Sequence, residues 1–290
     1  MSPRLRQLLY APEQSPPRIR WQFIVPENNA RALRQLHDRG RQIDDPRISH
    51  QPDCRKRAVA AAHSLAYSAP MTEPETRLAS VYDAIAKASK LAGRRADATT
   101  LIAVSKTRTP DDITPLIAAG QRDFGENRVQ EAQSKWPALI AATPDIRLHL
   151  VGQLQSNKAE EAVALFDVIH SVDRLSLITA VAKAQDKAGR KPDCFLQVNI
   201  GDEDQKGGCA VADIPALLAE SRNVGVTIVG LMAVPPADLE PAPYFALLAK
   251  LARDNDLNQL SMGMSGDFET AVKLGATHIR VGTALFGERL

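Results

Sequence analysis

Eight short apolar runs recur along the chain from residue 100 onward, and segments with helical spacing separate them. Such runs, bounded by Gly, Pro and polar residues, are typical of strands in a buried parallel sheet. The predicted strands are residues 100–106, 123–126, 148–152, 168–172, 194–200, 227–234, 260–264 and 278–286. The predicted helices that separate them are residues 110–119, 128–139, 157–166, 175–188, 214–220, 244–253 and 267–274. This alternation favours an α/β fold.

One more helix is predicted ahead of the first strand, over residues 73–92. Thr72 and Glu75 have the spacing of a capping box, and Gly93 supplies a stop. Little chain follows the eighth strand, so we expect this first helix to cover the gap beside it.

Eight strand–helix units within about 220 residues fit a single (β/α)8 TIM barrel with an extra N-terminal helix. A doubly wound open sheet is the alternative. That fold usually carries a Gly-x-Gly-x-x-Gly sequence after its first strand, and none follows residues 100–106 here. The barrel is therefore the favoured fold.

Residues 1–70 differ in composition from residues 71–290. They hold 12 Lys and Arg against 6 Asp and Glu, with little apolar periodicity beyond short helical patterns at 30–39 and 57–66. Three interpretations are open: a disordered extension, an organellar transit peptide, and an over-extended reading frame with Met71 as the true start. The six acids count against a transit peptide. The predicted organisation is an extension over 1–70 and a barrel over 71–290.

Composition narrows the class of protein further. Hydrophobic residues make up 44% of the chain and aromatics only 4%, which predicts a core of Ala, Val, Ile and Leu. Residues 71–290 carry 24 basic against 28 acidic side chains, which argues against a nucleic-acid partner. No apolar run is long enough for a membrane span, and the start lacks the apolar segment of a secretory signal.

The three cysteines are Cys54, Cys194 and Cys209. They are too few and too scattered for a disulfide framework or a metal site, so we expect free thiols in a reducing cytoplasm. Cys209 follows two glycines and is expected to be exposed.

The first strand ends in Ser105 and Lys106, and Thr109-Pro110 then begins a helix. Lys106 therefore lies where a barrel strand passes into its loop, on the face that carries active sites. Two interpretations are open: a salt-bridged or snorkelling lysine, and an amine that forms a Schiff base.

Two loops on the same predicted face suit a phosphate group. Ser265-Gly266 precedes a helix start, where exposed amides attract anions, and Gly282-Thr283 follows the eighth strand. Barrels often hold a phosphate at the loops after strands seven and eight. Each pair also has a structural interpretation, as a helix cap and as a packing glycine.

A lysine after strand one and a phosphate site after strands seven and eight together match pyridoxal 5'-phosphate (PLP). Arg280 alternates with apolar neighbours in the eighth strand, so its side chain points to one face. If that face is inward, Arg280 could donate a hydrogen bond to the pyridine nitrogen. The alternative is an inner ion pair.

The motifs resemble those of the pyridoxal phosphate homeostasis protein family, whose single barrel is similar to the N-terminal domain of bacterial alanine racemases. The matching stretches are residues 103–107, 124–131, 149–158, 197–199 with 206–207, 230–236, 260–265 and 280–287. They occur in family order and cover about residues 71–290. Residues 1–70 have no counterpart in the pattern.

The resemblance implies that PLP is held as a Schiff base on Lys106, with Arg280 facing the pyridine nitrogen. The cofactor-binding residues that it implies are Lys106, Asn127, Ser265, Arg280, Gly282 and Thr283. The chain departs from the family at Gln153, where proline or histidine is usual, and at Ala210, where proline is common. Both are loop positions and neither removes a predicted contact.

The function that follows is intracellular PLP homeostasis, in which the protein buffers or delivers the cofactor without catalytic turnover. The partners expected are PLP itself and, as recipients, apo forms of PLP-dependent enzymes. The alternative is a single-domain PLP-dependent amino-acid racemase. Alanine racemases bring a catalytic tyrosine from a second domain, whereas this chain stops after its eighth strand and has no tyrosine at a predicted strand end. We therefore expect a monomeric binding protein.

Overall fold

The computed structural model describes residues 71–287, and residues 1–70 and 288–290 lie outside that range. The predicted extension, its short helices at 30–39 and 57–66, and Cys54 all fall on residues outside it. Those interpretations stay predictions.

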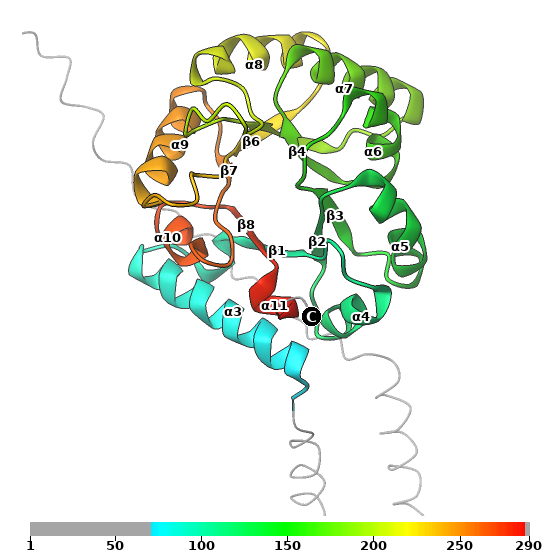
Figure 1. The fold of residues 1–290 in the computed structure, drawn as a ribbon, viewed down its shortest axis with the longest axis vertical. Coiled ribbons are helices and arrows are strands. Elements are labelled where there is room, and N and C mark those ends of the chain that lie inside the picture. The colour runs from blue at the N-terminus through cyan, green and yellow to red at the C-terminus, as the bar shows by residue number, and fades with distance from the viewer. Residues whose placement is uncertain (1–70, 288–290) are drawn as a thin grey trace, which may run out of the picture. The chain divides into compact units, whose positions relative to one another are not determined.

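Eight parallel strands pair in chain order and close on themselves (Figure 1). The strands are β1 (Thr100–Val104), β2 (Asp123–Glu126), β3 (Arg147–Leu150), β4 (Val168–Val172), β5 (Asp193–Gln197), β6 (Ile228–Met232), β7 (Gln259–Ser261) and β8 (His278–Val281). β1 pairs with β2 on one side and with β8 on the other, in a register that runs from Thr100↔His278 to Ala103↔Val281. This closure confirms the TIM barrel and rules out the open sheet.

Helices surround the barrel and alternate with its strands (Figure 1). They are α3 (Glu73–Leu91), α4 (Pro110–Ala118), α5 (Val129–Ala142), α6 (Ala159–Leu165), α7 (Leu175–Ala188), α8 (Ile214–Asn223), α9 (Ala242–Asp254), α10 (Phe268–Lys273) and α11 (Thr283–Phe286). Short 3-10 turns are η2 (Ala96–Ala98), η3 (Ser156–Lys158) and η4 (Val211–Asp213). Between residues 71 and 287, none of these helices has the length and apolar character needed to cross a bilayer.

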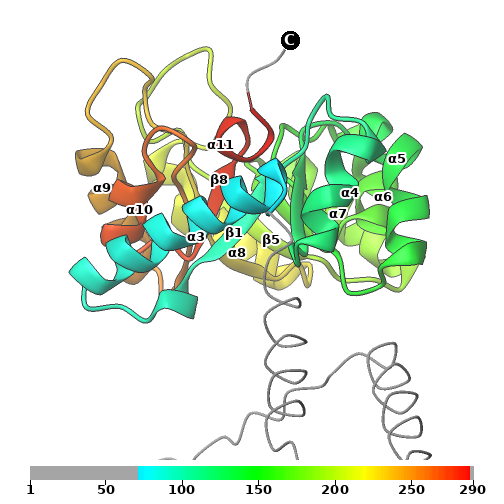
Figure 2. The same ribbon diagram turned by 90° about the horizontal axis from the view of Figure 1, so that it is seen from below.

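The predicted first helix and its cap are confirmed. Thr72 and Glu75 form both hydrogen bonds of a capping box at the start of α3. α3 packs against α10 and α11, beside the first and last strands, as Figures 1 and 2 show. It therefore covers the flank where the barrel closes.

The end of the chain corrects one prediction. The predicted strand 278–286 ends at Val281, and residues 283–286 form the short helix α11. The chain turns at Gly282, where φ is −117° and ψ is −74°. A short apolar run is compatible with either a strand or a buried helical turn, which is why the pattern did not separate the two.

The barrel has two buried layers of different character. Between strands and helices lies a large cluster of mainly aliphatic side chains, with Trp136 and Phe124 in contact at 5.1 Å between ring centroids. The barrel interior holds a small apolar cluster of Val168, Phe195 and Met232, beside buried polar side chains. The expectation of an aliphatic core is thus met outside the strands but only partly inside them.

Candidate functional site

Lys106 lies in the loop that follows β1, at the carboxyl end of the barrel. It is half-buried, between the buried Ser105 and the exposed Thr107, whose φ of +61° puts a β-branched residue in the left-handed region. Within residues 71–287 the Lys106 ammonium has no hydrogen-bond or ion-pair partner. The salt-bridged interpretation of this lysine therefore finds no support among the described residues.

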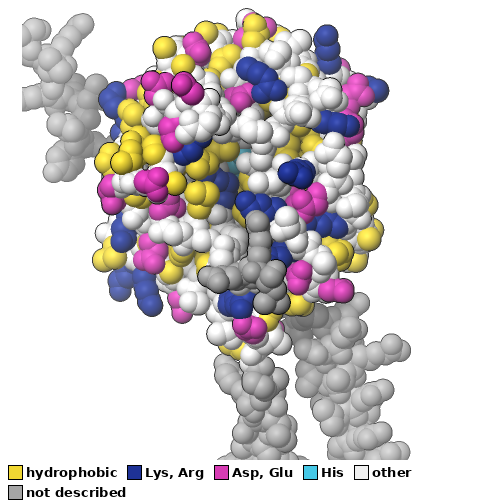
Figure 3. Space-filling view, viewed as in Figure 1, with side chains coloured by type: hydrophobic (Ala, Val, Ile, Leu, Met, Phe, Trp, Pro, Cys, Tyr) yellow, Lys and Arg dark blue, Asp and Glu magenta, His cyan; other side chains and the backbone are white. Residues whose placement is uncertain are grey.

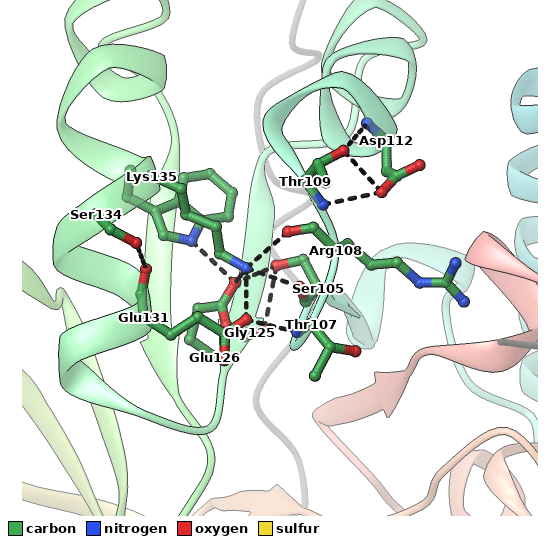
Figure 4. A network of polar contacts seen from close by, with 11 residues as sticks. Ser105, Thr107, Arg108, Thr109, Asp112, Gly125, Glu126, Glu131, Ser134 and Lys135 are labelled. Atoms are coloured by element: carbon green, nitrogen blue, oxygen red, sulfur yellow. Dashed lines mark hydrogen bonds and ion pairs between the residues drawn. The ribbon is translucent and has the colours of Figure 1, made fainter. Parts of the chain in front are cut away.

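A buried lysine on α5 holds the loop around Lys106 in place (Figure 4). Lys135 Nζ donates to the carbonyl oxygens of Ser105 at 2.9 Å and Arg108 at 3.1 Å, one on each side of Lys106. The backbone N–H of Thr107 donates to Glu131 Oε1 at 2.5 Å. Both anchors belong to α5, so the loop is tied to the helix that follows β2.

Two carboxylates balance the charge of Lys135. Glu126 Oε1, fully buried, lies 2.8 Å from Lys135 Nζ, and Glu131 Oε1 lies 2.9 Å from it. Glu126 Oε1 also accepts from the Ser105 hydroxyl at 2.6 Å and from the Trp136 indole at 3.0 Å, while its second oxygen has no partner among residues 71–287. The end of β1 is therefore fixed by a buried ionic network.

Arg280 points into the barrel and is 5% exposed. Its guanidinium donates to Ser261 Oγ at 2.7 Å and to the Ala233 carbonyl oxygen at 3.0 Å. Burial lowers the pKa of Arg280 to about 10, with Asp267 acting in the opposite direction, so the group is a cation at neutral pH. Across the described range it forms no ion pair, which leaves N–H groups available to a ligand.

The loops after β7 and β8 meet beside the end of β1. Ser265 Oγ accepts the N–H of Gly282 at 3.2 Å. A side chain at Gly282 would lie 3.4 Å from the Val104 carbonyl oxygen, so this glycine lies next to the strand that leads to Lys106. Ser265 is half-buried and Thr283 is exposed. The fold thus brings the two predicted phosphate loops together at the carboxyl end of the barrel.

Asn127 follows β2 at the same end and is half-buried. The loop after β3 packs tightly against it, because a Cβ at Gly152 would come within 2.3 Å of the Asn127 carbonyl oxygen. The next residue, Gln153, donates to Gln197 Oε1 at 2.7 Å, and Gln197 donates to the Gly207 carbonyl oxygen at 3.0 Å. The departure from the family at position 153 therefore forms a polar bridge between loops.

The face that carries these loops is seen in Figures 1 and 3. Figure 2 shows α11 and the long loops after β5 and β6 rising on one side of the barrel. In Figure 3 several Lys and Arg side chains lie around the middle of this face. A positive surround of this kind suits an anionic ligand.

Sequence reasoning missed a cluster of histidines inside the barrel. His149, His170 and His278 are all buried, and the His170 ring stacks on Phe195 at 4.5 Å between centroids. Burial is the main cause that lowers the pKa of each, in the case of His278 to about 3. Their positions in strands, alternating with outward apolar residues, were the available signal.

A cavity of about 250 Å³ opens at the amino ends of the strands, away from Lys106. The residues that line it include Arg147, Asp193, Gln259, Thr277 and His278. It thus lies at the opposite end of the barrel from the predicted cofactor residues.

The expectation of an exposed Cys209 is wrong. Its side chain, in the loop after β5, is 5% exposed, and burial raises the pKa of its thiol to about 12. Cys194 is also a free, buried thiol whose pKa burial raises to about 12. Residues 71–287 contain no cluster of His, Cys, Asp or Glu that could hold a metal ion.

The chain matches the family described as alanine racemase, N-terminal domain, over residues 81–290. It is 41% identical over 219 residues to the pyridoxal phosphate homeostasis protein of Pseudomonas aeruginosa, covering 73% of this chain and 94% of that protein. It is 35% identical over 229 residues to the protein of that name from Escherichia coli K12, covering 76% of this chain and 98% of that one.

Solved structures agree with this relationship. PipY of Synechococcus elongatus, solved with PLP bound, is 42% identical, with a TM-score of 0.62 over 70% of this chain and 100% of its own. An alanine racemase of Clostridium difficile is 11% identical, with a TM-score of 0.55 over 72% of this chain and 56% of its own, a likeness that concerns the fold alone. On this evidence the chain belongs to the pyridoxal phosphate homeostasis protein family, within the alanine racemase N-terminal domain family.

Proposed function

We propose that this protein binds PLP as a Schiff base on Lys106, in the cytoplasm, and serves PLP homeostasis by buffering or delivering the cofactor. The observation that carries the proposal is the Lys106 amine. It is half-buried at the carboxyl end of the barrel and has no partner among residues 71–287. PLP bound to a lysine supplies an electrophilic imine and an electron-accepting ring.

The residues around Lys106 fit such a ligand. Ser265, Gly282 and Thr283 would hold the phosphate, and Asn127 would line the pocket. The buried Arg280 has unused N–H groups and would face the pyridine nitrogen. Relatives support this proposal, because PipY was solved with PLP bound and the similar proteins of Pseudomonas aeruginosa and Aquifex aeolicus are pyridoxal phosphate homeostasis proteins by name.

Absence of turnover is part of the proposal. The tyrosines of the described range, Tyr82 and Tyr244, lie on the outer helices α3 and α9, and the Tyr82 hydroxyl donates to Gln121. Neither supplies an acid or base beside Lys106, and the thiols of Cys194 and Cys209 are buried. The recipients of the cofactor would be apo PLP-dependent enzymes, and we expect the protein to be a monomer.

The test is the absorbance spectrum of the purified full chain with PLP, before and after borohydride. We expect an imine band in the wild type that reduction removes, with a cofactor-sized mass fixed on Lys106. Lys106→Ala should lose the band, whereas Lys158→Ala, which removes another half-buried lysine after a strand, should keep it. A wild type that stays colourless with added PLP refutes the proposal.

Racemisation is the second candidate, favoured by the match to the alanine racemase N-terminal domain. Incubating the PLP-loaded protein with L-alanine and L-serine, followed by chiral chromatography, separates the two. D-amino acid formed at ordinary enzyme rates, about 1 per second or faster, supports the racemase. Chirally unchanged substrate supports the binding protein.

A further inference from the structure

A continuous chain of hydrogen-bonded side chains crosses the interior of the barrel. Asp123 Oδ1 lies 3.0 Å from His149 Nε2, and His149 Nδ1 lies 3.0 Å from His170 Nε2. His170 Nδ1 then lies 2.8 Å from Ser261 Oγ, and Ser261 Oγ accepts from Arg280 Nη1 at 2.7 Å. The residues come from β2, β3, β4, β7 and β8, so the chain spans the width of the barrel.

Asp123 and Arg280, the two ends of this series of hydrogen bonds, fix which atom carries each proton. The Asp123 carboxylate can only accept, so His149 carries its proton on Nε2 and its Nδ1 accepts. His170 must then donate from Nε2, which leaves its Nδ1 as an acceptor for the Ser261 hydroxyl. The serine oxygen accepts in turn from Arg280, which can only donate.

The result is a chain of four hydrogen bonds that all run from Arg280 toward Asp123. Both histidines in it are neutral, in agreement with full burial, which lowers the pKa of each. Hydrogen bonds that point the same way polarise one another in a low-dielectric interior. The buried charge of Arg280 is therefore linked to a carboxylate through three neutral side chains.

His278 provides the contrast within the same cluster. Its ring lies 6.0 Å from that of His170 and is 9% exposed, beside the cavity at the amino ends of the strands, and within residues 71–287 its Nδ1 bonds only to the neighbouring Thr277 Oγ1. His278 packs against the hydrogen-bonded series of side chains but takes no part in it. A variant at His278 therefore tests packing. Variants at Ser261 and Asp123 test the hydrogen bonds.

We propose that Ser261, His170 and His149 are positioning residues that orient Arg280 toward the pyridine nitrogen of PLP, with Asp123 as the charge that polarises them. This rests on the proposed function, in which Arg280 faces that nitrogen. The chain fixes the guanidinium plane through Nη1, and the Ala233 carbonyl oxygen fixes it through Nη2. The N–H groups that remain are then aimed by the fold.

The first experiment needs no cofactor. ¹⁵N NMR of histidine rings in the full chain, assigned with His149→Gln and His170→Gln, reports protonation and tautomer. We expect both rings to be neutral with the proton on Nε2 between about pH 6 and pH 8. A cationic ring, or a proton on Nδ1 of either residue, overturns the proposed order of the chain.

The second experiment reads the pyridine nitrogen directly, with PLP labelled with ¹⁵N in its ring. We expect Ser261→Ala and Asp123→Asn to move its resonance toward that of free, unprotonated PLP, and to raise the dissociation constant of PLP about five-fold. His278→Gln should leave the resonance and the dissociation constant at their wild-type values. Asp123→Asn is the sharpest variant, because it keeps an amide oxygen as a possible acceptor but removes the charge and the requirement that this end of the chain accept.

The outcomes separate the two proposals. A wild type that binds PLP, with Ser261→Ala and Asp123→Asn indistinguishable from it, refutes the positioning role and leaves the proposed function intact. Equal shifts in these variants and in His278→Gln also refute it, because they would show a packing effect. A wild type that binds no PLP refutes the proposed function and this role together.

Discussion

Replacing Lys135 by methionine tests whether the buried network under the β1–α4 loop holds Lys106 in place. Methionine keeps much of the volume and the flexibility of the lysine stem but removes its charge and its donors. In the wild type the Lys135 side chain is 6% exposed, and its ammonium contacts the Ser105 and Arg108 carbonyl oxygens, Glu126 and Glu131. The substitution leaves the fully buried Glu126 without its cationic partner.

The expected loss of unfolding free energy follows from the broken ion pair between Lys135 and Glu126. Removing one partner of a buried pair costs about 3–5 kcal/mol, because the other charge stays buried without compensation. Two carbonyl oxygens also lose a donor, although solvent can reach part of the loop. Since a domain has only about 5–15 kcal/mol of stability, Lys135→Met should remove a large share of it.

The assay is urea unfolding followed by circular dichroism, with Lys135→Met compared to Lys135→Met/Glu126→Gln. We expect the single variant to lose about 4 kcal/mol and the double variant to recover about 2 kcal/mol, since glutamine leaves no charge buried. Lys183→Met, on the exposed surface of α7, is the control and should change little. A loss below about 1 kcal/mol in Lys135→Met would refute the reasoning.

Three further predictions rest on separate contacts. Gly152→Ala should displace the Asn127 backbone, from which its Cβ would be 2.3 Å away, and weaken PLP binding measured by absorbance titration. In a Cys54→Ser background, Cys209 should resist maleimide at pH 8 until urea is added, because burial raises the pKa of its thiol to about 12. His278 has its pKa lowered from 6.5 to about 3, so it is neutral when folded and protonated when unfolded at pH 5. Its contribution to stability is complete above pH 6.5 and falls as the pH drops, so His278→Gln should reduce the loss of unfolding free energy between pH 7 and pH 5 by about 2 kcal/mol.

Much of the fold could be predicted because the local signals agree with the global one. Predicted strands 123–126 and 168–172 and the helix 175–188 match β2, β4 and α7 at both ends. Strong stops such as Gly189, with a φ of +62°, set those boundaries. Other predicted strands run too far at the carboxyl face, as 148–152 and 260–264 do, because apolar residues continue past the strand into the loop.

The sequence was enough to place the candidate cofactor residues on one face of the barrel. It was not enough to predict the side chains that hold their loops in place. Lys106, Ser265 and Gly282 follow strand ends, and the order of strands in a barrel is enough to place them on one face. The contacts of Lys135 and Glu126 with the loop depend on side-chain reach between β2, α5 and the end of β1, which no local pattern encodes. The same holds for Gln153, whose hydrogen bond to Gln197 joins the loop after β3 to the end of β5, 44 residues further along the sequence.

The polar side chains inside the barrel contribute less to stability than apolar ones would, but they hold the Arg280 guanidinium in a defined orientation. A single donor without a partner among His149, His170 and Ser261 would lower the stability of the fold. Apolar side chains of the same volume would carry no such penalty. Aliphatic packing outside the strands supplies stability without them, since the large buried cluster lies there. Between Arg280 and Asp123, however, every donor meets an acceptor in one consistent order. An apolar interior would leave the guanidinium without an oriented partner on this side, and its direction would then be free. The polar chain therefore serves the placement of one cation more than the stability of the fold.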